Sequence, residues 1–554
     1  MFCFQCSETA NGKGCTAIGV CGKTDQTAIL QDMLIFALKG ISFWGEKARE
    51  IDVKDSEADV FVMEGLFTTV TNVNFDSHVI SEKINKAFNI RNRLRDAFLK
   101  HYEEKNGKKF AGEVPEAAAW HPEGGIESYI AKGMTIGVLA TENEDVRSLR
   151  EFLVYGLKGI AAYADHAYIL NHMNPEIIAF LQEGLAATIN NELTADDLVA
   201  LLMKAGKVGV DVLALLDKAN TTAYGIPEIT QVYTGTKAAP GILVSGHDLL
   251  DFEELLKQTE GTGVMVYTHG EMLPANAYPA FKKYDHLIGN FGSAWYLQQK
   301  EFDSFGGAIV MTTNCMQKPT EKYKDRIFTT GLVAWPDVKH IGDRKNGEPK
   351  DWSPVVKKAQ ELGNIKETEG KFLTIGFNHN TIMSVADKVV EAVKAGAIKR
   401  FVVMAGCDGR FKSREYFTHV AEKLPQDTVI LTAGCAKYRY NMLDLGDIGG
   451  IPRVIDAGQC NDSYSLAVTA LKLAEVFGVE NVNDLPISYD IAWYEQKAVI
   501  VLLALLYLGV KNIRLGPVLP GFVSPNVLKV IVEKFDIKPT GTADEDVEAM
   551  MAGK

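Results

Sequence analysis

The chain has 554 residues, of which 47% are hydrophobic and 23% charged, and its formal net charge is −13. This length predicts about three or four domains, with enough apolar residues for large cores. Nucleic acid and anionic membranes require a basic footprint, so the acidic balance excludes both as main partners and favours small molecules or basic redox proteins.

The N-terminal segment, MFCFQCSETANGKGC, has neither the basic start nor the apolar run of an export signal, so we expect a cytoplasmic protein. Disulfides are rare in that compartment, and metal binding or catalysis is the better expectation for the eight cysteines. The most apolar run, Ala498 to Val510, is shorter than the roughly 20 residues of a membrane span. It predicts a buried helix.

The first four cysteines form a compact C-x2-C-x8-C-x5-C array: Cys3, Cys6, Cys15 and Cys21. Glycines surround them, and an apolar core has no need for four closely spaced thiols in a glycine-rich loop. The array therefore predicts four thiolates that converge on one metal centre. Zinc and iron–sulfur clusters both accept four thiolates, and the spacing alone leaves both open.

The first 222 residues predict a helical domain, because apolar residues recur at intervals of three and four in segments such as HVISEKINKAFNIRNRLRDAFLKHYEE. Two segments of this region also repeat. LIFALKGIS, from Leu34, matches LVYGLKGIA, from Leu153, and EGLFTTVTN, from Glu64, matches EGLAATINN, from Glu183, both at an offset of 119 residues. Two matches at one offset predict a duplicated helical bundle.

From residue 223 onward, short β-rich runs end in glycine or polar residues and alternate with helical segments, which predicts α/β domains. The runs are GILVSG, GVMVYTHG and GGAIVMTTN, then KFLTIGFN, RFVVMAG, TVILTAG and RVIDAG. Between the two groups, the charged stretch KDWSPVVKKAQELGNIKETEGK predicts a boundary near Glu367. The expected domains are therefore residues 1–222, 223–367 and 368–554.

The other four cysteines all follow predicted strands: Cys315, Cys407, Cys435 and Cys460. His247 and Glu271 also follow strands, and Glu495 precedes the apolar helix. A lone histidine or glutamate at a strand end is usually a hydrogen-bonded surface or capping residue. Their coincidence in two neighbouring sheets indicates one site, because ligands of parallel sheets lie beyond the carboxyl ends of strands. Thiolates, an imidazole and carboxylates together suit iron bridged by sulfide and oxygen, whereas zinc is satisfied by four ligands.

These residues resemble the ligand motifs of the hybrid cluster protein family, also called prismane proteins, and the similarity extends over essentially the whole chain. The resemblance implies a helical domain of two three-helix bundles followed by two Rossmann-like α/β domains, a fold related to carbon monoxide dehydrogenase. It implies a 4Fe-4S cluster at the N-terminal array, whose spacing resembles the strictly anaerobic type. Where the three domains meet, it implies a hybrid iron–sulfur–oxygen cluster of the 4Fe-2O-2S type, held by His247, Glu271, Cys315, Cys407, Cys435, Cys460 and Glu495. Cys407, in the motif AGCDG, would carry an extra sulfur as a persulfide.

The activity that the resemblance implies is reduction of hydroxylamine to ammonia and water, or reduction of nitric oxide, with electrons from a redox partner protein relayed through the 4Fe-4S cluster. We expect a monomer. The candidate catalytic residues are Glu495, Lys497 and Cys407, the first two as proton donors, although a solvated lysine at a helix start is an equally good interpretation of Lys497.

Two alternatives remain. An electron carrier or redox sensor without turnover gains from closed all-cysteine clusters, so the mixed ligand set argues against it. A carbon monoxide dehydrogenase would need cysteines beyond the eight, because two sets of four use them all.

Overall fold

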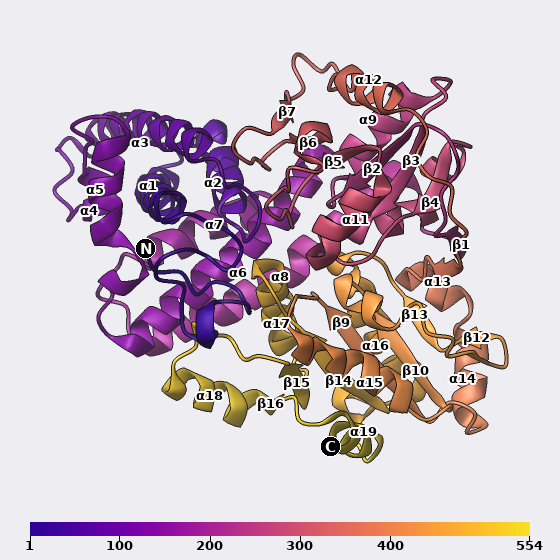
Figure 1. Ribbon diagram of the computed structural model, residues 1–554. Helices are drawn as coiled ribbons and strands as arrows, with labels where there is room; N and C mark the ends of the chain where they lie inside the picture. Colours follow the sequence, from indigo (N-terminus) through magenta and orange to yellow (C-terminus); the bar gives the residue numbers. More distant parts are fainter.

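Two three-helix bundles form the N-terminal part of the computed structural model, which describes residues 1–554. The first bundle contains α1 (Asp25–Arg49), α2 (Ser56–Thr68) and α3 (Ser77–Asn106), and the second contains α6 (Glu144–Ile169), α7 (Pro175–Ala187) and α8 (Ala195–Tyr224). Two short helices, α4 (Glu116–Ala119) and α5 (Ile126–Ile136), lie in the connection. Figure 1 shows this helical domain on one side and the two α/β domains on the other.

The positions of the helices confirm the predicted duplication. α1 and α6 begin at Asp25 and Glu144, and α2 and α7 begin at Ser56 and Pro175, so both pairs keep the 119-residue offset. Each of the six helices starts behind a polar side chain that accepts a hydrogen bond from a backbone amide of the first turn. These caps are Thr24, Asp55, Asp76, Asn143, Asn174 and Thr194.

α1 is the central helix of the first bundle. It is long and apolar enough to cross a membrane by length and composition alone, but 78% of its most apolar window is buried inside the protein. It packs against α3 in its own bundle and against α7 of the other. Its apolar character therefore belongs to the core where the two bundles meet.

The first α/β domain contains a six-stranded parallel sheet with the order β4-β3-β2-β5-β6-β7. Its strands are β2 (Gly241–Ser245), β3 (Met265–His269), β4 (Leu287–Asn290), β5 (Ala308–Met311), β6 (Ile327–Thr330) and β7 (Lys339–Ile341). Its helices are α9 (Leu249–Thr259), α10 (Pro279–Lys282), α11 (Gln298–Phe305) and α12 (Ser353–Leu362).

The second α/β domain repeats this architecture, with the strand order β13-β10-β9-β14-β15-β16. Its strands are β9 (Arg400–Gly406), β10 (Thr428–Thr432), β13 (Val454–Asp456), β14 (Ile487–Ala492), β15 (Ile513–Gly516) and β16 (Ile537–Pro539). Its helices are α13 (His379–Ser384), α14 (Ala386–Lys394), α15 (Glu415–Lys423), α16 (Ser463–Phe477), α17 (Gln496–Tyr507), α18 (Pro525–Phe535) and α19 (Ala543–Met551).

Numbered along the chain, the strands of both sheets follow the order 3-2-1-4-5-6, which is the doubly wound order of Rossmann folds. In such sheets the chain winds outward in opposite directions from the first and fourth strands, and a crevice opens at their carboxyl ends. Here these strand pairs are β2 with β5 and β9 with β14. The strand order alone therefore predicts a ligand-binding crevice beyond the carboxyl ends of each of these two strand pairs.

Two small antiparallel sheets complete the fold: β1 (Thr230–Tyr233) with β8 (Phe372–Ile375), and β11 (Asp447–Ile448) with β12 (Ile451–Pro452). β8 lies in the run KFLTIGFN, which we expected to belong with the strands that follow it. It pairs instead with β1, a strand that precedes the first α/β sheet. The domain boundaries expected at residues 222 and 367 stay predictions.

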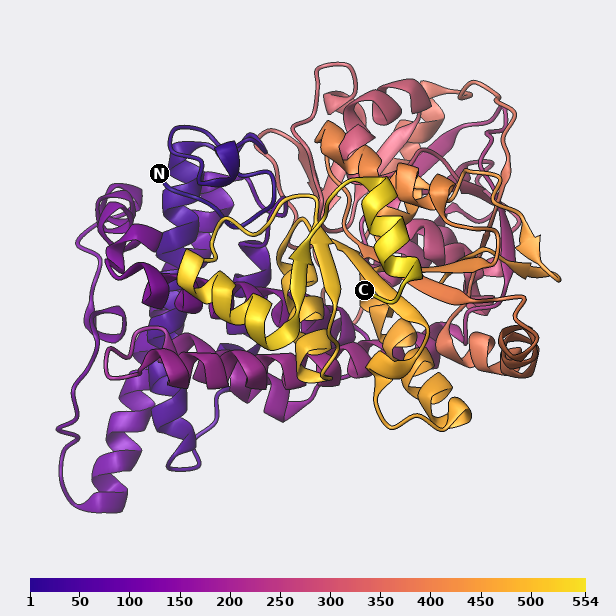
Figure 2. The same cartoon turned by 90° about the horizontal axis from the view of Figure 1, so that it is seen from below.

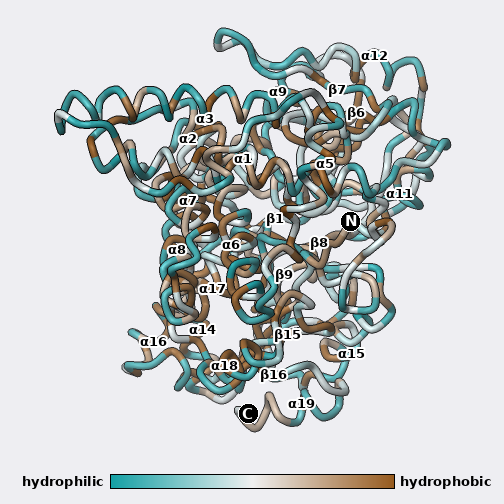
Figure 3. Tube along the Cα trace, turned by 90° about the vertical axis from the view of Figure 1, so that its left-hand side faces the viewer, coloured by the Kyte–Doolittle hydropathy of each residue, from teal (hydrophilic) through white to brown (hydrophobic).

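α17 is the buried helix that the apolar run predicted, and it packs on α6 and α8 of the helical domain. Glycines allow the close approach, since a β-carbon at Gly206 of α8 would run into the carbonyl oxygen of Leu503. Figure 3 shows hydrophobic residues gathered where α6, α8 and α17 lie together. Further along the chain, α18 lies beside the helical domain (Figure 2), where Ser524 Oγ donates to Asp145 Oδ1 at 2.6 Å. The last domain is thus anchored to the first.

Candidate metal centres

The four N-terminal cysteines line one small cavity beside the start of α1, as the array predicts. Two backbone hydrogen bonds hold Cys3 against Cys15, from Cys3 N to Cys15 O (3.1 Å) and from Cys15 N to Cys3 O (2.8 Å). None of the eight cysteines forms a disulfide. The arrangement leaves four thiols free to bind one centre.

The buried ammonium of Lys23 lines the same cavity. Lys23 Nζ donates to Gln31 Oε1 at 2.5 Å. Burial lowers the pKa of Lys23, but the thiolates of Cys3 and Cys21 outweigh burial and leave the pKa raised. Burial also raises the pKa of the Cys6 thiol well above its ordinary value. One ammonium cannot balance four thiolates, so the donor set fits a metal centre of higher positive charge.

The seven residues of the second predicted set line a second cavity, between the two parallel sheets: His247, Glu271, Cys315, Cys407, Cys435, Cys460 and Glu495. Six of them follow a strand that lies at or beside a crevice, and Cys460 follows the edge strand β13. His247 and Cys315 follow β2 and β5, and Cys407 follows β9. Glu271 follows β3, Cys435 follows β10, and the remaining two follow β13 and β14. The topology thus aims residues from distant parts of the chain at one point.

Glycines at the strand ends turn the chain so that the cysteines reach the cavity. Gly406 precedes Cys407 with φ 110°, and Gly434 precedes Cys435 with φ 86°, both in the region that favours glycine. A β-carbon at Gly434 would lie 2.5 Å from the carbonyl oxygen of Gly406. The break after each β-rich run in the sequence therefore has a steric cause.

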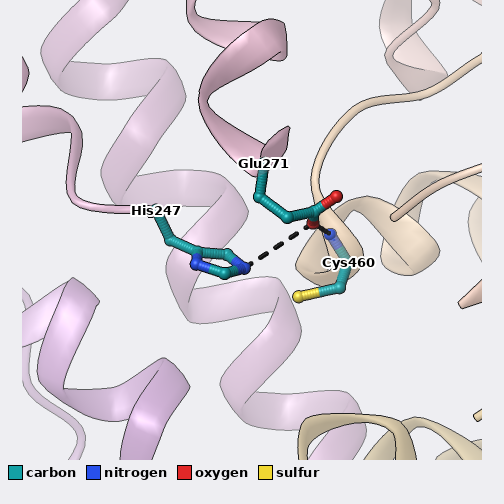
Figure 4. A group of neighbouring side chains, drawn as sticks. All are labelled: His247, Glu271 and Cys460. Carbon is teal, nitrogen blue, oxygen red and sulfur yellow. Dashed lines mark hydrogen bonds and ion pairs between the residues drawn. The ribbon is translucent and has the colours of Figure 1, made fainter. Parts of the chain in front are cut away.

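His247, Glu271 and Cys460 form the tightest part of the second set, with ligand atoms all within 4.8 Å of one another (Figure 4). A hydrogen bond of 2.9 Å between His247 Nδ1 and Thr313 Oγ1 directs Nε2 toward Glu271 Oε2, 3.6 Å away. Cys460 N donates to the same Oε2 at 2.7 Å, whereas Glu271 Oε1 is buried without any partner. An orphaned carboxylate oxygen beside an imidazole and a thiol fits a bound cation.

Glu495 and Lys497 occupy the start of α17. Glu495 caps the helix, because its Oε2 accepts from Lys497 N at 2.8 Å. Lys497 Nζ donates to Asn314 Oδ1 at 2.9 Å and lies 3.1 Å from His247 Nε2. Since Lys497 is only 1% exposed, the interpretation of this residue as a solvated lysine is wrong.

The electrostatics of the second set also favour a metal. Burial raises the pKa of Cys407 to about 12 and raises that of Cys315 well above its ordinary value. Burial likewise raises the pKa of Glu271 and of Glu495, in spite of nearby lysines. A bound metal deprotonates coordinating thiols and stabilises carboxylates. Soft and hard donors gathered in one buried cavity thus fit an iron–sulfur–oxygen cluster better than an all-cysteine one.

Sequence reasoning missed several side chains around this cavity. Tyr163 of α6 donates its hydroxyl to Cys460 Sγ at 3.3 Å. Asn314 donates to Cys315 Sγ at 3.4 Å, and its place in TTNC was the only available signal. Trp295 and Tyr494 stack at 4.3 Å between ring centroids and also line the cavity. Tertiary packing alone identifies these contacts.

An apolar cavity of about 50 Å³ reaches the second set from the side of α16 and α17. Cys407 and Cys460 belong to its lining, and most of the other lining residues are aliphatic, such as Leu466 and Val501. Leu471, also in the lining, is 44% exposed at the surface. The cavity therefore offers an apolar space next to two of the cysteines.

Comparisons with known proteins agree with this geometry. The chain matches the family described as Prismane/CO dehydrogenase family over residues 1–548. It is 66% identical over 554 residues to a hydroxylamine reductase of Kosmotoga olearia and 61% identical over 556 residues to one of Nitratidesulfovibrio vulgaris, with 100% of both chains covered in each case.

Solved structures of two carbon monoxide dehydrogenases share the fold. The enzyme of Thermococcus sp. AM4 gives a TM-score of 0.57 at 17% identity, covering 99% of this chain and 90% of that one. Carbon monoxide dehydrogenase IV of Carboxydothermus hydrogenoformans gives 0.56 at 15% identity, covering 97% and 89%. The predicted fold class, a helical domain followed by two Rossmann-like domains related to carbon monoxide dehydrogenase, is confirmed.

Proposed function

The chain belongs to the Prismane/CO dehydrogenase family, and on this basis we propose that it is a hydroxylamine reductase, with NH2OH + 2e⁻ + 2H⁺ giving NH3 + H2O. The observation that carries the proposal is the meeting of one imidazole, two carboxylates and four thiols in a single cavity at the crevices of two sheets. A pure electron carrier has no use for displaceable carboxylate ligands.

Family membership implies iron–sulfur clusters. We assign a 4Fe-4S cluster to Cys3, Cys6, Cys15 and Cys21, and a hybrid 4Fe-2O-2S cluster to the seven residues of the second set. When bound, the hybrid cluster supplies electrons and an iron position that the nitrogen substrate occupies. The chain itself must supply protons, exclude water and conduct electrons between the two sites.

Lys497 is the best placed proton donor. Burial lowers the pKa of its ammonium, but the surrounding thiolates and carboxylates, Cys460 and Glu495 foremost, outweigh burial and leave the pKa raised. The proton is therefore held at Nζ, 3.1 Å from His247 Nε2. Glu495 Oε1 lies 3.8 Å from this Nζ, so the carboxylate could pass a proton to the amine only when it does not bind the cluster.

The stacked rings of Trp295 and Tyr494 offer a route for electrons between the two sites. They form one hydrophobic cluster with Cys435, and Cys6 of the N-terminal array packs against this cluster together with Cys315 and Cys407. Side-chain packing thus connects Cys6 with residues of the second set. Electrons from a partner protein would enter at the N-terminal array.

Nitric oxide reduction is the second candidate function, 2NO + 2e⁻ + 2H⁺ giving N2O + H2O. The apolar cavity lined in part by Cys407 and Cys460 favours it, because nitric oxide partitions into an aliphatic cavity more readily than the strongly hydrogen-bonding hydroxylamine. Both reactions need the same two electrons and two protons, so the site chemistry does not separate them.

Steady-state kinetics would rank the two activities. Anaerobically purified protein is given hydroxylamine or nitric oxide with one common electron donor, and ammonia and nitrous oxide are quantified. We expect ammonia from hydroxylamine in amounts that match the electrons consumed. Protein that carries both clusters and converts neither substrate would contradict the proposal in favour of a carrier or sensor.

A further inference from the structure

The corner formed by Thr71 and Asn72, between α2 and α3, faces the N-terminal cysteine array. Both residues line the cavity of the four cysteines, and both are 2% exposed. Three polar atoms of this corner are buried without a partner: Thr71 Oγ1, Asn72 Nδ2 and Asn72 Oδ1. An unpaired buried polar group costs about 1–3 kcal/mol, so these atoms require an explanation.

The backbone of the corner is fixed on both sides by segments that carry the second set. Thr71 N donates to Oε1 of Gln496, the residue after Glu495, at 2.8 Å. Met316 N, next to Cys315, donates to Asn72 O at 2.9 Å. The two side chains are therefore held toward the cysteines, and no side-chain bond restrains the amide of Asn72 from turning its NH2 group inward.

Cluster sulfides and cysteine thiolates accept hydrogen bonds, and this corner presents one hydroxyl and one amide donor. We propose that Thr71 Oγ1 and Asn72 Nδ2 donate hydrogen bonds to the iron–sulfur cluster of the N-terminal array and thereby raise its reduction potential. Donors stabilise the reduced cluster more than the oxidised one, because the reduced cluster carries more negative charge. This inference rests on the cluster assigned under the proposed function.

The helical duplication supplies an internal comparison. Asn191, which matches Asn72 at the 119-residue offset, is exposed, and its Oδ1 accepts from Arg150 Nη2 at 3.0 Å. A need for asparagine at positive φ explains part of position 72, where φ is 61°. It does not explain the unpartnered hydroxyl of Thr71. Only the copy that faces the cysteines is buried without partners.

The test compares Thr71→Val and Asn72→Asp with the wild type in an EPR-monitored redox titration of anaerobically purified full-length protein. Valine keeps the shape of threonine, and aspartate tolerates positive φ but replaces the donor with a negative charge. We expect each change to lower the equilibrium constant for reduction of the N-terminal cluster at least threefold. This is about 28 mV at 59 mV per tenfold for one electron.

Two control variants make the same substitutions, threonine to valine and asparagine to aspartate, at residues that do not line the cavity of the N-terminal cysteines. Thr69→Val removes a hydroxyl that donates to Leu66 O at 2.8 Å. Asn191→Asp adds a negative charge to the second bundle, at the position that matches Asn72. We expect both to titrate like the wild type. Potentials of Thr71→Val and Asn72→Asp equal to the wild-type value would overturn the inference.

Spectroscopy of the wild type keeps the inference testable if the variants fail to assemble. In protein labelled with 15N-asparagine, pulsed EPR of the reduced N-terminal cluster should detect a side-chain 15N coupling. Its absence from a protein with an intact cluster overturns the inference but leaves the proposed function standing. Wild-type protein without any 4Fe-4S signal overturns both.

Discussion

Glu271 and Glu495 bring hard, displaceable ligands into a cavity that otherwise contains four thiols and one imidazole. Both side chains are buried, and burial raises the pKa of each. A protein that only stored electrons would gain nothing from holding such groups in the ionised state. The free-energy cost of burying two ionised carboxylates has a purpose if each would bind iron in one oxidation state and release it in another.

Replacing either carboxylate with the neutral amide tests this role. We expect Glu271→Gln and Glu495→Gln to lower hydroxylamine turnover at least tenfold, or to lose iron from the second site, while the N-terminal cluster titrates normally. Glutamine keeps the size and removes the charge. Iron analysis, EPR and steady-state rates are the measurements.

Glu254→Gln is the matched control, because Glu254 is also a buried carboxylate. Its Oε1 lies 2.7 Å from Arg344 Nε, and it lines neither cysteine cavity. We expect it to retain both clusters and full turnover. If Glu271→Gln and Glu495→Gln also kept an intact second cluster and full rates, their assignment as ligands would be wrong.

Asp490 predicts a pH dependence of stability that is unrelated to the metal. This carboxyl is fully buried in β14, and burial raises its pKa to about 7. A raised carboxyl pKa stabilises the folded state below about pH 4, where both states are protonated, and this stability is lost as the pH rises to about 7. Ionisation above pH 7 then costs at most about 4 kcal/mol, at 1.36 kcal/mol per unit.

Thermal unfolding of Asp490→Asn at pH 5 and pH 8 checks the prediction. The neutral amide avoids the ionisation cost, so we expect a higher Tm than the wild type at pH 8 and a smaller difference at pH 5. An equal difference at both pH values would show that folding does not raise the pKa of Asp490.

Most of the candidate site was predictable from the sequence, because six of the seven donors follow a strand signal and Glu495 precedes the most apolar run. The side chains that support the donors were not. Tyr163 reaches Cys460 from a helix almost three hundred residues earlier, at 3.3 Å, and nothing near Tyr163 in the chain indicates this contact. Asn72 is likewise a turn residue in the local pattern, and only the fold places it against the cysteines.

At the scale of elements, the periodic patterns predicted the duplicated helical region and six strands that deliver donors: β2, β3, β5, β9, β10 and β13. They missed β14, which precedes Glu495, and the edge strands β7 and β16. β7 and β16 have only three residues each, too few for an alternating pattern. The run KFLTIGFN was placed with the strands that follow it, whereas β8 pairs with β1, so that Thr230 lies opposite Ile375, 145 positions later. Pairing partners at such separation leave no local signal.

The packing of α17 on α8 gives a prediction at this scale. A methyl group at Gly206 would run into the Leu503 carbonyl, and backbone atoms cannot move aside as a side chain can. Overpacking of this kind costs about 1–3 kcal/mol. Because α17 begins directly after Glu495, a shift of the helix displaces that carboxylate and Lys497.

We therefore expect Gly206→Ala to lower the Tm and to reduce the iron content of the second site, with the N-terminal cluster retained. Gly124→Ala is the control, since a β-carbon there meets nothing closer than 4.0 Å. Thermal unfolding and iron analysis of both variants decide the matter. Full iron content with an unchanged Tm in Gly206→Ala would show that α17 does not depend on this close approach.

At the scale of the whole molecule, the N-terminal loop is attached to the last domain by groups other than its thiols. Arg410, in the segment AGCDGR, donates to Glu8 Oε2 at 2.8 Å. Arg414 Nη2 donates to Ser7 Oγ at 2.9 Å, and Ser7 N donates to Tyr494 O at 3.0 Å. The two cysteine sets are thus joined through a scaffold that does not require either metal.

This separation predicts the behaviour of Cys3→Ser. The substitution removes one thiolate from the N-terminal array, but the backbone bonds between residues 3 and 15 and the contacts of Ser7 and Glu8 do not involve the sulfur. We expect the N-terminal 4Fe-4S signal to be lost or altered, the second cluster to remain assembled, and turnover with a protein electron donor to fall at least tenfold. EPR or Mössbauer spectra, iron analysis and steady-state rates measure the three quantities.

The matched control is Thr16→Ser, an exposed substitution in the same loop that leaves every thiol in place and is expected to behave like the wild type. A small reductant that reaches the second site directly should restore part of the rate of Cys3→Ser, since the loss lies in electron delivery and not in chemistry. If both spectral signatures disappear together, the N-terminal cluster is required to build the second site. In that case the two centres assemble as one unit.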